Sequence, residues 1–404
     1  MTDTEGLMSE TLTTASGVPV AHMWAIDAPI AGKPDLGFPA MPGTRHTVIF
    51  EPTRETGGYN HHPQIAHHEQ RFFAMWSNHP RGEDGPGQRV LWSRSANGDE
   101  WSDARELFPP PGDVRDSDLT GLVLTAVKWV ALGERLFAVV GLHENIGFTT
   151  ASGEGLQETR GGEFRTRARK GFSRLAREVF PDGSFGRVMA IGAEVPERLA
   201  FPVRTDATTA DEVHRRLLDP THSPSWDFQR RWAFPDGVSG NKLCEPTAYR
   251  AKDGRLVCLQ RDKERSHRMY VSVSADDGAT WPPAQPTDIP DSPSLATTVV
   301  LGDGRVLLIG NQVATELDNP DGERHYFRDP LTLAVSDDGY VFDRAYALCA
   351  NHYVPRIDGV RGRGGGPQYP AAIVVEGELH VIYSLGKENV GVTRVSLDQL
   401  ATTR

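Results

Sequence analysis

Three residues that stand immediately before a proline have side chains suited to acid–base or binding chemistry: His62, Glu245 and Tyr369. Each proline lies near the start of a run whose alternation of apolar and polar residues is typical of a half-buried β-strand. If these runs are equivalent strands of a repeated unit, their first residues face one shared pocket. An imidazole, a carboxylate and a phenol would then meet where they could move protons or bind a polar substrate.

A second set of polar residues ends the strand-like runs that come next in each unit: His79, His143, Arg261 and Lys387. Because a hairpin brings its second strand back to the edge where the first began, we expect these side chains near the first set. The carboxylate of Glu245, placed before a buried strand, must be paired or solvated, which predicts an arginine partner or a pocket.

Several of these residues also have plain structural interpretations. His61 and His62 could cap a strand beside Pro63, and His79 could pack a loop. Tyr369 could be an ordinary core aromatic residue. The residue types alone are therefore compatible with a structural role and with a role in a functional site.

A basic cluster, Arg165, Arg167 and Arg169, lies in the glycine-rich stretch of about 151–187. We expect this stretch to be a long loop or short helix inserted between strands. Such a cluster is ordinarily a solvated face, but long ordered loops often carry function. Its position favours one arginine folding over the pocket.

A metal site has some support, because neutral imidazoles are good zinc ligands. His61 and His62 are neighbours, however, and neighbours on a strand point to opposite faces, so they do not easily share one ion. The chain has no HExxH, CxxC or phosphate-loop pattern. We expect no required cofactor and leave room for a bound structural zinc or calcium ion.

The elements that position these residues are recognisable from a repeated turn. Ser274–Trp281 has the spacing Ser-x-Asp-x-Gly-x-Thr-Trp after an alternating run, and Arg94–Trp101 and Val335–Phe342 are weaker copies. Asp276 is expected to bond the amides of its own turn and Gly278 to supply a positive φ. A supersecondary unit that recurs along the chain indicates a propeller or solenoid.

The 404 residues, with 41 glycines and 29 prolines, favour one large closed β architecture. We predict an all-β fold, a single β-propeller of four-stranded antiparallel blades over residues 18–404, after a flexible tail at 1–17. Five recognisable units, one irregular unit at 185–240 and N-terminal strands that could close the ring give about seven blades, with six as the alternative.

Charge and hydropathy argue against nucleic acid and membrane as partners of this protein. The formal charge is −11, which argues against a nucleic-acid surface. No segment approaches the 18 or so consecutive apolar residues of a membrane span, and no secretion signal is visible. The three cysteines do not form a disulfide framework. We expect a cytoplasmic protein, secreted only if a leader has been trimmed.

The repeated turn resembles the Asp box of the sialidase-superfamily propellers. Other segments resemble one group within that superfamily, the glucuronate-directed polysaccharide lyases (ulvan lyases and L-rhamnose-α-1,4-D-glucuronate lyases). They are Tyr59-Asn-His-His-Pro, Met75-Trp-Ser-Asn-His-Pro, Glu83-Asp-Gly-Pro-Gly-Gln-Arg, Gly171-Phe-Ser-Arg-Leu-Ala-Arg-Glu-Val and Gln368-Tyr-Pro. The resemblance spans roughly residues 55 to 400 and implies β-elimination beside a uronic acid in an oligosaccharide or polysaccharide.

That chemistry needs a base, an acid and a cation on the carboxylate. The resemblance places the two histidines at His62 (or His61) and His79, the carboxylate-binding arginine at Arg169, and Tyr369 as a further candidate. It leaves His61, His143, Arg165, Arg167, Glu245, Arg261 and Lys387 as substrate-binding residues. The tyrosine expected near the middle of the chain is not clearly present, and His143 or Phe148 occupies that neighbourhood.

Two alternatives remain open. A sialidase or other glycoside hydrolase would use a Tyr/Glu nucleophile pair, which Tyr369 and Glu245 could form, together with three arginines and an aspartate. The Arg-Ile-Pro usual near the first blade of sialidases is absent. The other alternative is a non-catalytic propeller that binds glycans or proteins, because fold alone does not determine function.

Overall fold

The computed structural model describes residues 12–14, 17–113, 120–149, 156–157, 166–192, 194–219, 243–262, 266–318, 328–351, 353–360 and 365–400; at 147–149, 156–157 and 166–169 only the backbone is described. The described chain is built almost entirely of antiparallel strands, as the alternating runs predict. The exceptions are α1 (Ala207–Leu218) and two short 3-10 turns, η2 (Pro34–Gly37) and η3 (Leu397–Leu400).

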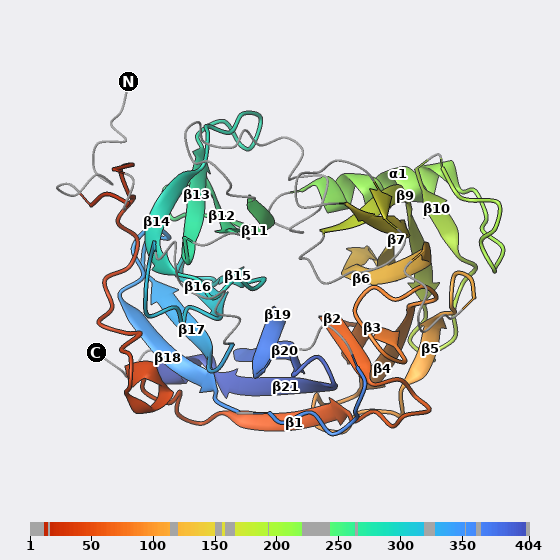
Figure 1. Cartoon of the computed structure of the whole chain (residues 1–404), viewed down its shortest axis with the longest axis horizontal. Helices are drawn as coiled ribbons and strands as arrows, with labels where there is room; N and C mark the ends of the chain where they lie inside the picture. The colour runs from red at the N-terminus through yellow and green to blue at the C-terminus, as the bar shows by residue number, and fades with distance from the viewer. Residues whose placement is uncertain are drawn as a thin grey trace.

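The strands form five sheets arranged in a ring (Figure 1). The first sheet has the order β2 (Tyr59–His68), β3 (Arg71–His79), β4 (Arg89–Ser95), β5 (Arg105–Phe108). The second has β6 (Thr120–Leu132), β7 (Arg135–Thr149), β9 (Thr166–Val179), β10 (Met189–Ile191), with β8 (Leu156–Gln157) paired to β7.

The other three sheets follow the same plan. The third is β11 (Leu243–Arg250), β12 (Leu256–Asp262), β13 (Arg268–Ser274), β14 (Gln285–Pro290). The fourth is β15 (Thr297–Val300), β16 (Val306–Gly310), β17 (Leu331–Ser336), β18 (Arg344–Cys349). The fifth is β19 (Pro367–Val375), β20 (Glu378–Leu385), β21 (Asn389–Ser396), β1 (Arg45–Phe50). The inner strands β2, β6, β11, β15 and β19 surround the centre.

The all-β propeller with four-stranded antiparallel blades is confirmed, but the prediction of seven blades, or six, is wrong: the described residues form five. Two of the units that were counted do not make blades of their own. The irregular stretch after residue 185 supplies β10 as the outer strand of the second blade, followed by α1. The N-terminal strand β1 completes the fifth blade instead of starting a new one.

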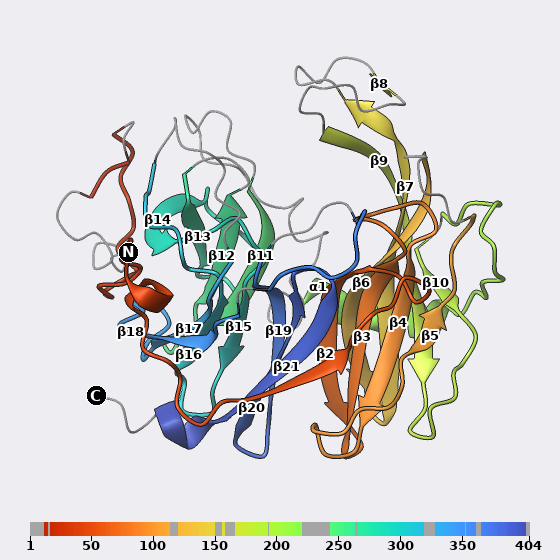
Figure 2. The same cartoon turned by 60° about the horizontal axis from the view of Figure 1, so that its bottom comes forward.

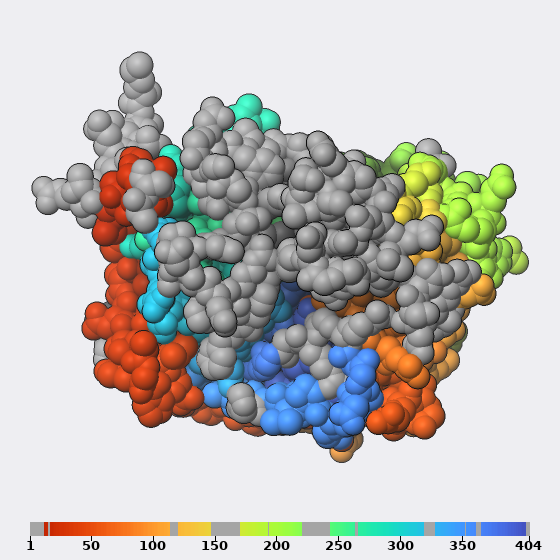
Figure 3. All heavy atoms as spheres, viewed as in Figure 1, coloured from red at the N-terminus to blue at the C-terminus, as the bar shows by residue number. Residues whose placement is uncertain are grey.

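Pairing of β1 with β21 closes the ring, because the outer strand of the last blade comes from the start of the chain. The segment before β1 runs along the outside of the third and fourth blades, visible in red in Figure 3. Isolated bridges tie it there, between Ala21 and Thr287 and between Ala40 and Ala347. It thereby covers the edge strands β14 and β18, which would otherwise expose unpaired backbone groups.

The Asp-box turn behaves as its residue types predict. The Asp276 carboxylate accepts hydrogen bonds from the Thr280 amide at 2.9 Å and the Ser274 hydroxyl at 2.8 Å, and Gly278 has a φ of +85°. The Trp281 indole donates to the Gly278 carbonyl at 3.1 Å. The weaker copy repeats this contact between Trp101 and Gly98. These hairpins form turns of the scaffold.

The stretch expected as an inserted loop, 151–187, contains the long strand β9. β9 pairs with β7 from Leu136 opposite Val179 to Thr149 opposite Thr166. Figure 2 shows this pair extending beyond the ring of blades. Among the residues that the structure describes, no helix is long and apolar enough to cross a membrane.

Candidate active site

A repeated backbone feature presents three side chains to the centre of the ring. His62, Glu245 and Tyr369 have φ values of +54°, +48° and +57°, each at a break in strand register on the inner strands β2, β11 and β19. Positive φ is uncommon for non-glycine residues, and β-bulges redirect the side chains they carry. The three residues before proline are therefore structurally equivalent, as the sequence register indicates.

Tyr369 and Glu245 meet at the centre and share one arginine. The Tyr369 hydroxyl donates to Glu245 Oε1 at 2.8 Å, and Arg261 Nη1 donates to the Tyr369 hydroxyl at 2.7 Å. Arg261 also pairs with Glu245 Oε2. The side chains of this ion pair are only 9% and 11% exposed, so the cluster is shielded from bulk water. The arginine partner expected for Glu245 is confirmed.

Burial raises the pKa of Tyr369 far above its ordinary value, an effect that Arg261 partly offsets and Glu245 reinforces. The phenol is therefore neutral at neutral pH. Because its hydrogen bond points to a carboxylate and its oxygen accepts from a guanidinium, the phenol can lose its proton to Glu245 while Arg261 stabilises the negative charge that develops.

Two more cations lie against the Tyr369 ring. The Arg328 guanidinium carbon is 5.4 Å and the Lys387 ammonium 5.9 Å from the ring centroid. Arg328 is held by Gln368 Oε1 and by the Pro293 carbonyl, and Lys387 by Glu83 Oε2 at 2.9 Å. Both residues are buried. An anionic group that entered this space would meet positive charge from several sides.

His61 and His62 lie beside the same ring, with centroids 4.1 Å and 5.5 Å from that of Tyr369. Burial, and next the charge of Lys387, lowers the pKa of His61 well below its ordinary value; burial also lowers the pKa of His62. The expectation that these neighbours point to opposite faces is wrong. The bulge at His62 brings the two rings to 4.4 Å, because it interrupts the strand's alternation.

His79 lies in a different setting. It is fully buried, its Nδ1 accepts from the Arg81 amide at 3.2 Å and its Nε2 lies 3.2 Å from the Pro86 carbonyl. A Cβ placed on Gly85 would be 2.2 Å from its ring, so the loop after β3 packs directly on the imidazole. The loop after β3 therefore encloses the His79 imidazole.

The remaining predicted residues lie on the second blade or outside the described residues. His143 is in β7, opposite Val123 and Gly171. The backbones of Arg167 and Arg169 are in β9, opposite Phe148 and Asn145. Arg165 lies outside the residues that the structure describes.

Sequence reasoning missed Arg328 and Glu83. Arg328 lies three residues before Leu331, the first residue of β17, the third strand of its blade; in the blade before, Arg268 begins the third strand, β13. Third strands begin at the edge of the blade where second strands end. An arginine near that position could therefore have been predicted to lie close to the site. Glu83 lies in the loop between β3 and β4, for which the repeat gives no register.

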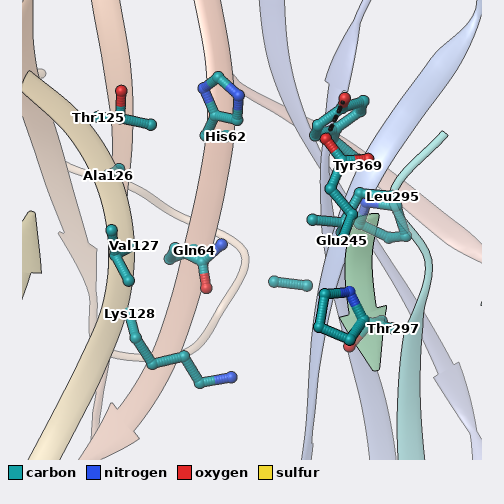
Figure 4. A pocket seen from close by; sticks show the side chains of 13 residues that line it. His62, Gln64, Thr125, Ala126, Val127, Lys128, Glu245, Leu295, Thr297 and Tyr369 are labelled. Atoms are coloured by element: carbon teal, nitrogen blue, oxygen red, sulfur yellow. Dashed lines mark hydrogen bonds between the residues drawn. The ribbon is translucent and has the colours of Figure 1, made fainter. Parts of the chain in front are cut away.

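A pocket runs along the axis between the inner strands and opens on this cluster (Figure 4). His62, Glu245 and Tyr369 line one part of it, and Gln64 and Lys128 point into the other. Burial lowers the pKa of Lys128 to about 8. The centre of the ring thus contains a cavity that has a phenol, a carboxylate and an imidazole in one part of its lining and an amide and an amine in the other.

Comparisons with known proteins agree with this architecture. A family model described as a BNR repeat-like domain matches residues 188–381, and one described as a BT_1020-like, N-terminal beta propeller matches residues 45–197. A search of the curated proteins finds no match. These findings give no support to the glucuronate-directed lyases in particular.

Among solved structures, one titled "Sialidase" is 20% identical with a TM-score of 0.67, covering 93% of this chain and 35% of that one. This chain thus spans about a third of that protein's length. The intramolecular trans-sialidase of Ruminococcus gnavus is 13% identical (TM-score 0.54; 90% and 99% covered). The leech intramolecular trans-sialidase is 11% identical (TM-score 0.53; 88% and 71% covered). The chain therefore has a β-propeller fold similar to those of these proteins, and its residues 188–381 are similar to a BNR repeat-like domain.

Proposed function

We propose that this protein is a glycoside hydrolase of the sialidase type, acting on a glycan at a sugar that carries a carboxylate. The observation that carries the proposal is the hydrogen-bonded set of Tyr369, Glu245 and Arg261, of which Tyr369 and Glu245 line the axial pocket. The Tyr/Glu pair is the one that a sialidase uses as nucleophile and base. Tyr369 and Glu245 come from different blades, and the same kind of bulge turns both side chains towards the centre. This repeated arrangement favours a functional site over ordinary packing in the core.

The reaction follows from the geometry. Tyr369 Oη attacks the anomeric carbon as the bond to the leaving oxygen breaks, and the phenol proton passes to Glu245 Oε1, 2.8 Å away. Arg261, 2.7 Å from the phenol oxygen, stabilises the developing charge. The leaving oxygen takes up a proton from a water molecule, which becomes hydroxide. A second water then attacks the anomeric carbon and breaks its bond to Tyr369. Its hydroxyl stays on the sugar, its proton neutralises the hydroxide, and the tyrosine oxygen regains its proton from Glu245.

Arg328 and Lys387 support the choice of an acidic sugar. Each is buried and lies against the Tyr369 ring, where it would attract a substrate carboxylate. The inner strand of the first blade has His61-His62-Pro63, whereas sialidases usually have Arg-Ile-Pro there. The neutral His61 argues for an acidic sugar recognised differently from sialic acid.

The proposal replaces β-elimination as the main hypothesis. The elimination hypothesis places its two histidines at His62 (or His61) and His79, but His79 is enclosed by the loop that packs on it. A binding propeller without activity would not need a buried phenol whose proton points to a carboxylate. The hydrogen-bonded Tyr369 thus favours nucleophilic catalysis over both alternatives.

A panel of fluorogenic glycosides tests the proposal, with sialic acid, other keto sugar acids, glucuronic acid and, as a neutral reference, glucose. We expect fluorophore release from at least one acidic sugar and not from glucoside. Tyr369→Phe should lower kcat by at least ~10³-fold, as expected for loss of a nucleophile.

Tyr340→Phe is the matched control, because Tyr340 also donates to a carboxylate, that of Asp253, but in a hairpin turn. It should keep full activity. The proposal fails if no acidic glycoside is cleaved, if Tyr369→Phe retains turnover, or if the product is an unsaturated uronate with its characteristic ultraviolet absorbance.

A further inference from the structure

Two buried ring nitrogens beside Tyr369, His61 Nε2 and His62 Nδ1, have no hydrogen-bond partner among the described residues. Nearly all buried polar atoms in proteins have one, so such a pair requires an explanation. His61 is fully buried, and one nitrogen of each ring is left available to a ligand.

The hydrogen bonds of His61 determine which nitrogen that is. Ser384 Oγ donates its single proton to the Gln368 carbonyl at 3.3 Å. When Ser384 donates to that carbonyl, the contact of 2.7 Å between His61 Nδ1 and Ser384 Oγ uses the Nδ1 proton. In that arrangement His61 Nε2 is unprotonated. Metal-binding histidines are oriented in this way, with the second nitrogen donating to a fixed acceptor.

A carboxylate completes the set. One ligand atom from each of His61, His62 and Glu83 lies within 4.8 Å of the other two. Glu83 Oε2 accepts from Lys387 Nζ at 2.9 Å. A carboxylate can bind a metal through one oxygen while the other keeps such a hydrogen bond, so Lys387 can hold Glu83 in place.

We propose that His61, His62 and Glu83 bind a divalent transition metal ion, with zinc as the first candidate. Two neutral imidazoles and one carboxylate suit zinc, which in open sites has three protein ligands and a free position. Calcium and magnesium prefer sets of oxygen ligands and fit poorly. The bulge at His62 is the structural cause, because on a regular strand the two rings would point apart.

The site goes beyond the proposed hydrolase function and does not depend on it. A metal ion here would stand beside the Tyr369 ring, 4.1 Å from that of His61 by centroids, on the first-blade side of the pocket. Arg261 and Arg328 reach the same ring from the third blade and from the loop before β17. The ion would add positive charge where the first blade supplies only neutral imidazoles.

Calorimetric titration tests the proposal, using the full chain stripped with EDTA and zinc chloride as the only ligand. The parent protein should bind one more equivalent of zinc than either His61→Ala or Glu83→Gln. Ser384→Ala, which removes only the acceptor of the His61 Nδ1 proton, should weaken binding by ~10–100-fold.

His68→Ala is the matched control, since His68 is a partly exposed histidine at the end of the same strand β2. It should bind as the parent does. Equal zinc binding by the parent, Glu83→Gln and Ser384→Ala would overturn the proposal, as would equal loss in His68→Ala. Circular dichroism checks the folding of each variant. If His61→Ala does not fold, Glu83→Gln still tests the proposal, because Glu83 lies in a loop and its substitution should not disturb a strand.

A separate readout distinguishes this site from the hydrolase proposal. Tyr369→Phe should keep the zinc equivalent although it abolishes turnover. Cobalt-loaded parent protein should show visible absorption bands that Glu83→Gln lacks. A protein that cleaves acidic glycosides but gives no difference in zinc binding between parent and Glu83→Gln would refute the metal site alone.

Discussion

Two clusters in this molecule contain the same three kinds of group and differ in nearly everything else. At the centre, Tyr369 bonds Glu245 and Arg261. At the periphery, Tyr340 donates to both oxygens of Asp253 at 3.0 and 2.9 Å, and the Arg255 guanidinium stacks 5.1 Å from its ring while bonding the same carboxylate. Each is a tyrosine, a carboxylate and an arginine.

Burial and backbone separate the two clusters. In the peripheral pair the arginine and carboxylate are 31% and 40% exposed, against 9% and 11% at the centre. The peripheral carboxylate lies in the tight turn between β11 and β12, whereas Glu245 and Tyr369 come from separate blades at strained bulges. The peripheral cluster joins two hairpin turns, whereas Glu245 and Tyr369 of the central cluster line the pocket.

The largest expected difference is in activity. Glu245→Gln keeps the shape of the side chain but removes the base, so turnover of an acidic glycoside should fall by ~10²–10⁴-fold. Asp253→Asn makes the same chemical change at the periphery and should leave kcat within about two-fold, because it is a surface substitution far from the pocket. Steady-state kinetics of the two variants checks this, and equal effects would contradict the assignment of the site.

The next difference is in stability. Arg261→Met removes one partner of a buried ion pair and leaves Glu245 without its counter-charge, which typically costs ~3–5 kcal/mol in the free energy of unfolding. Arg255→Met removes an exposed partner and should cost only ~0–1 kcal/mol. Urea unfolding followed by circular dichroism measures both. A smaller loss for Arg261→Met than for Arg255→Met would show that the central pair is not shielded as described.

The smallest expected effects concern how stability depends on pH, where Asp291 and Asp276 should act with opposite sign. Asp291, between β14 and β15, is buried and its carboxylate has no hydrogen-bond partner among the described residues. Burial raises its pKa well above the ordinary value, although Arg261 opposes this. The folded protein therefore keeps a proton that the unfolded chain releases above pH ~4, so this group makes stability fall as pH rises. Asp291→Asn should remove that fall.

Asp276 of the Asp box should behave in the opposite way. Hydrogen bonds from Thr280, followed by that from Ser274, lower its pKa to about 2. Its contribution to stability is present at neutral pH and is lost as pH falls from about 4 towards 2. Thermal unfolding from pH 3 to 8 should show Asp276→Asn losing stability relative to the parent at neutral pH and approaching it in acid. A parallel response of the two variants would contradict the contrast.

Local patterns made much of this fold predictable. The Ser274–Trp281 turn fixes its own hydrogen bonds, so its geometry follows from residue types alone. The blade count was not predictable in this way. Strand β1 looks like the start of a unit but is hydrogen-bonded to β21, at the other end of the chain, and no local signal encodes that pairing.

Some properties of the candidate site could likewise be predicted from local sequence, and others could not. The sequence alone determined that His62, Glu245 and Tyr369 are equivalent, because each precedes a proline at the start of an inner strand and the repeat sets their register. Only the tertiary structure decided what the residues do. It enclosed His79 beneath a loop, brought Arg328 to the Tyr369 ring and turned His61 and His62 to the same side. These outcomes depend on contacts between blades and on one positive φ, and neither is written in the spacing of residues along the chain.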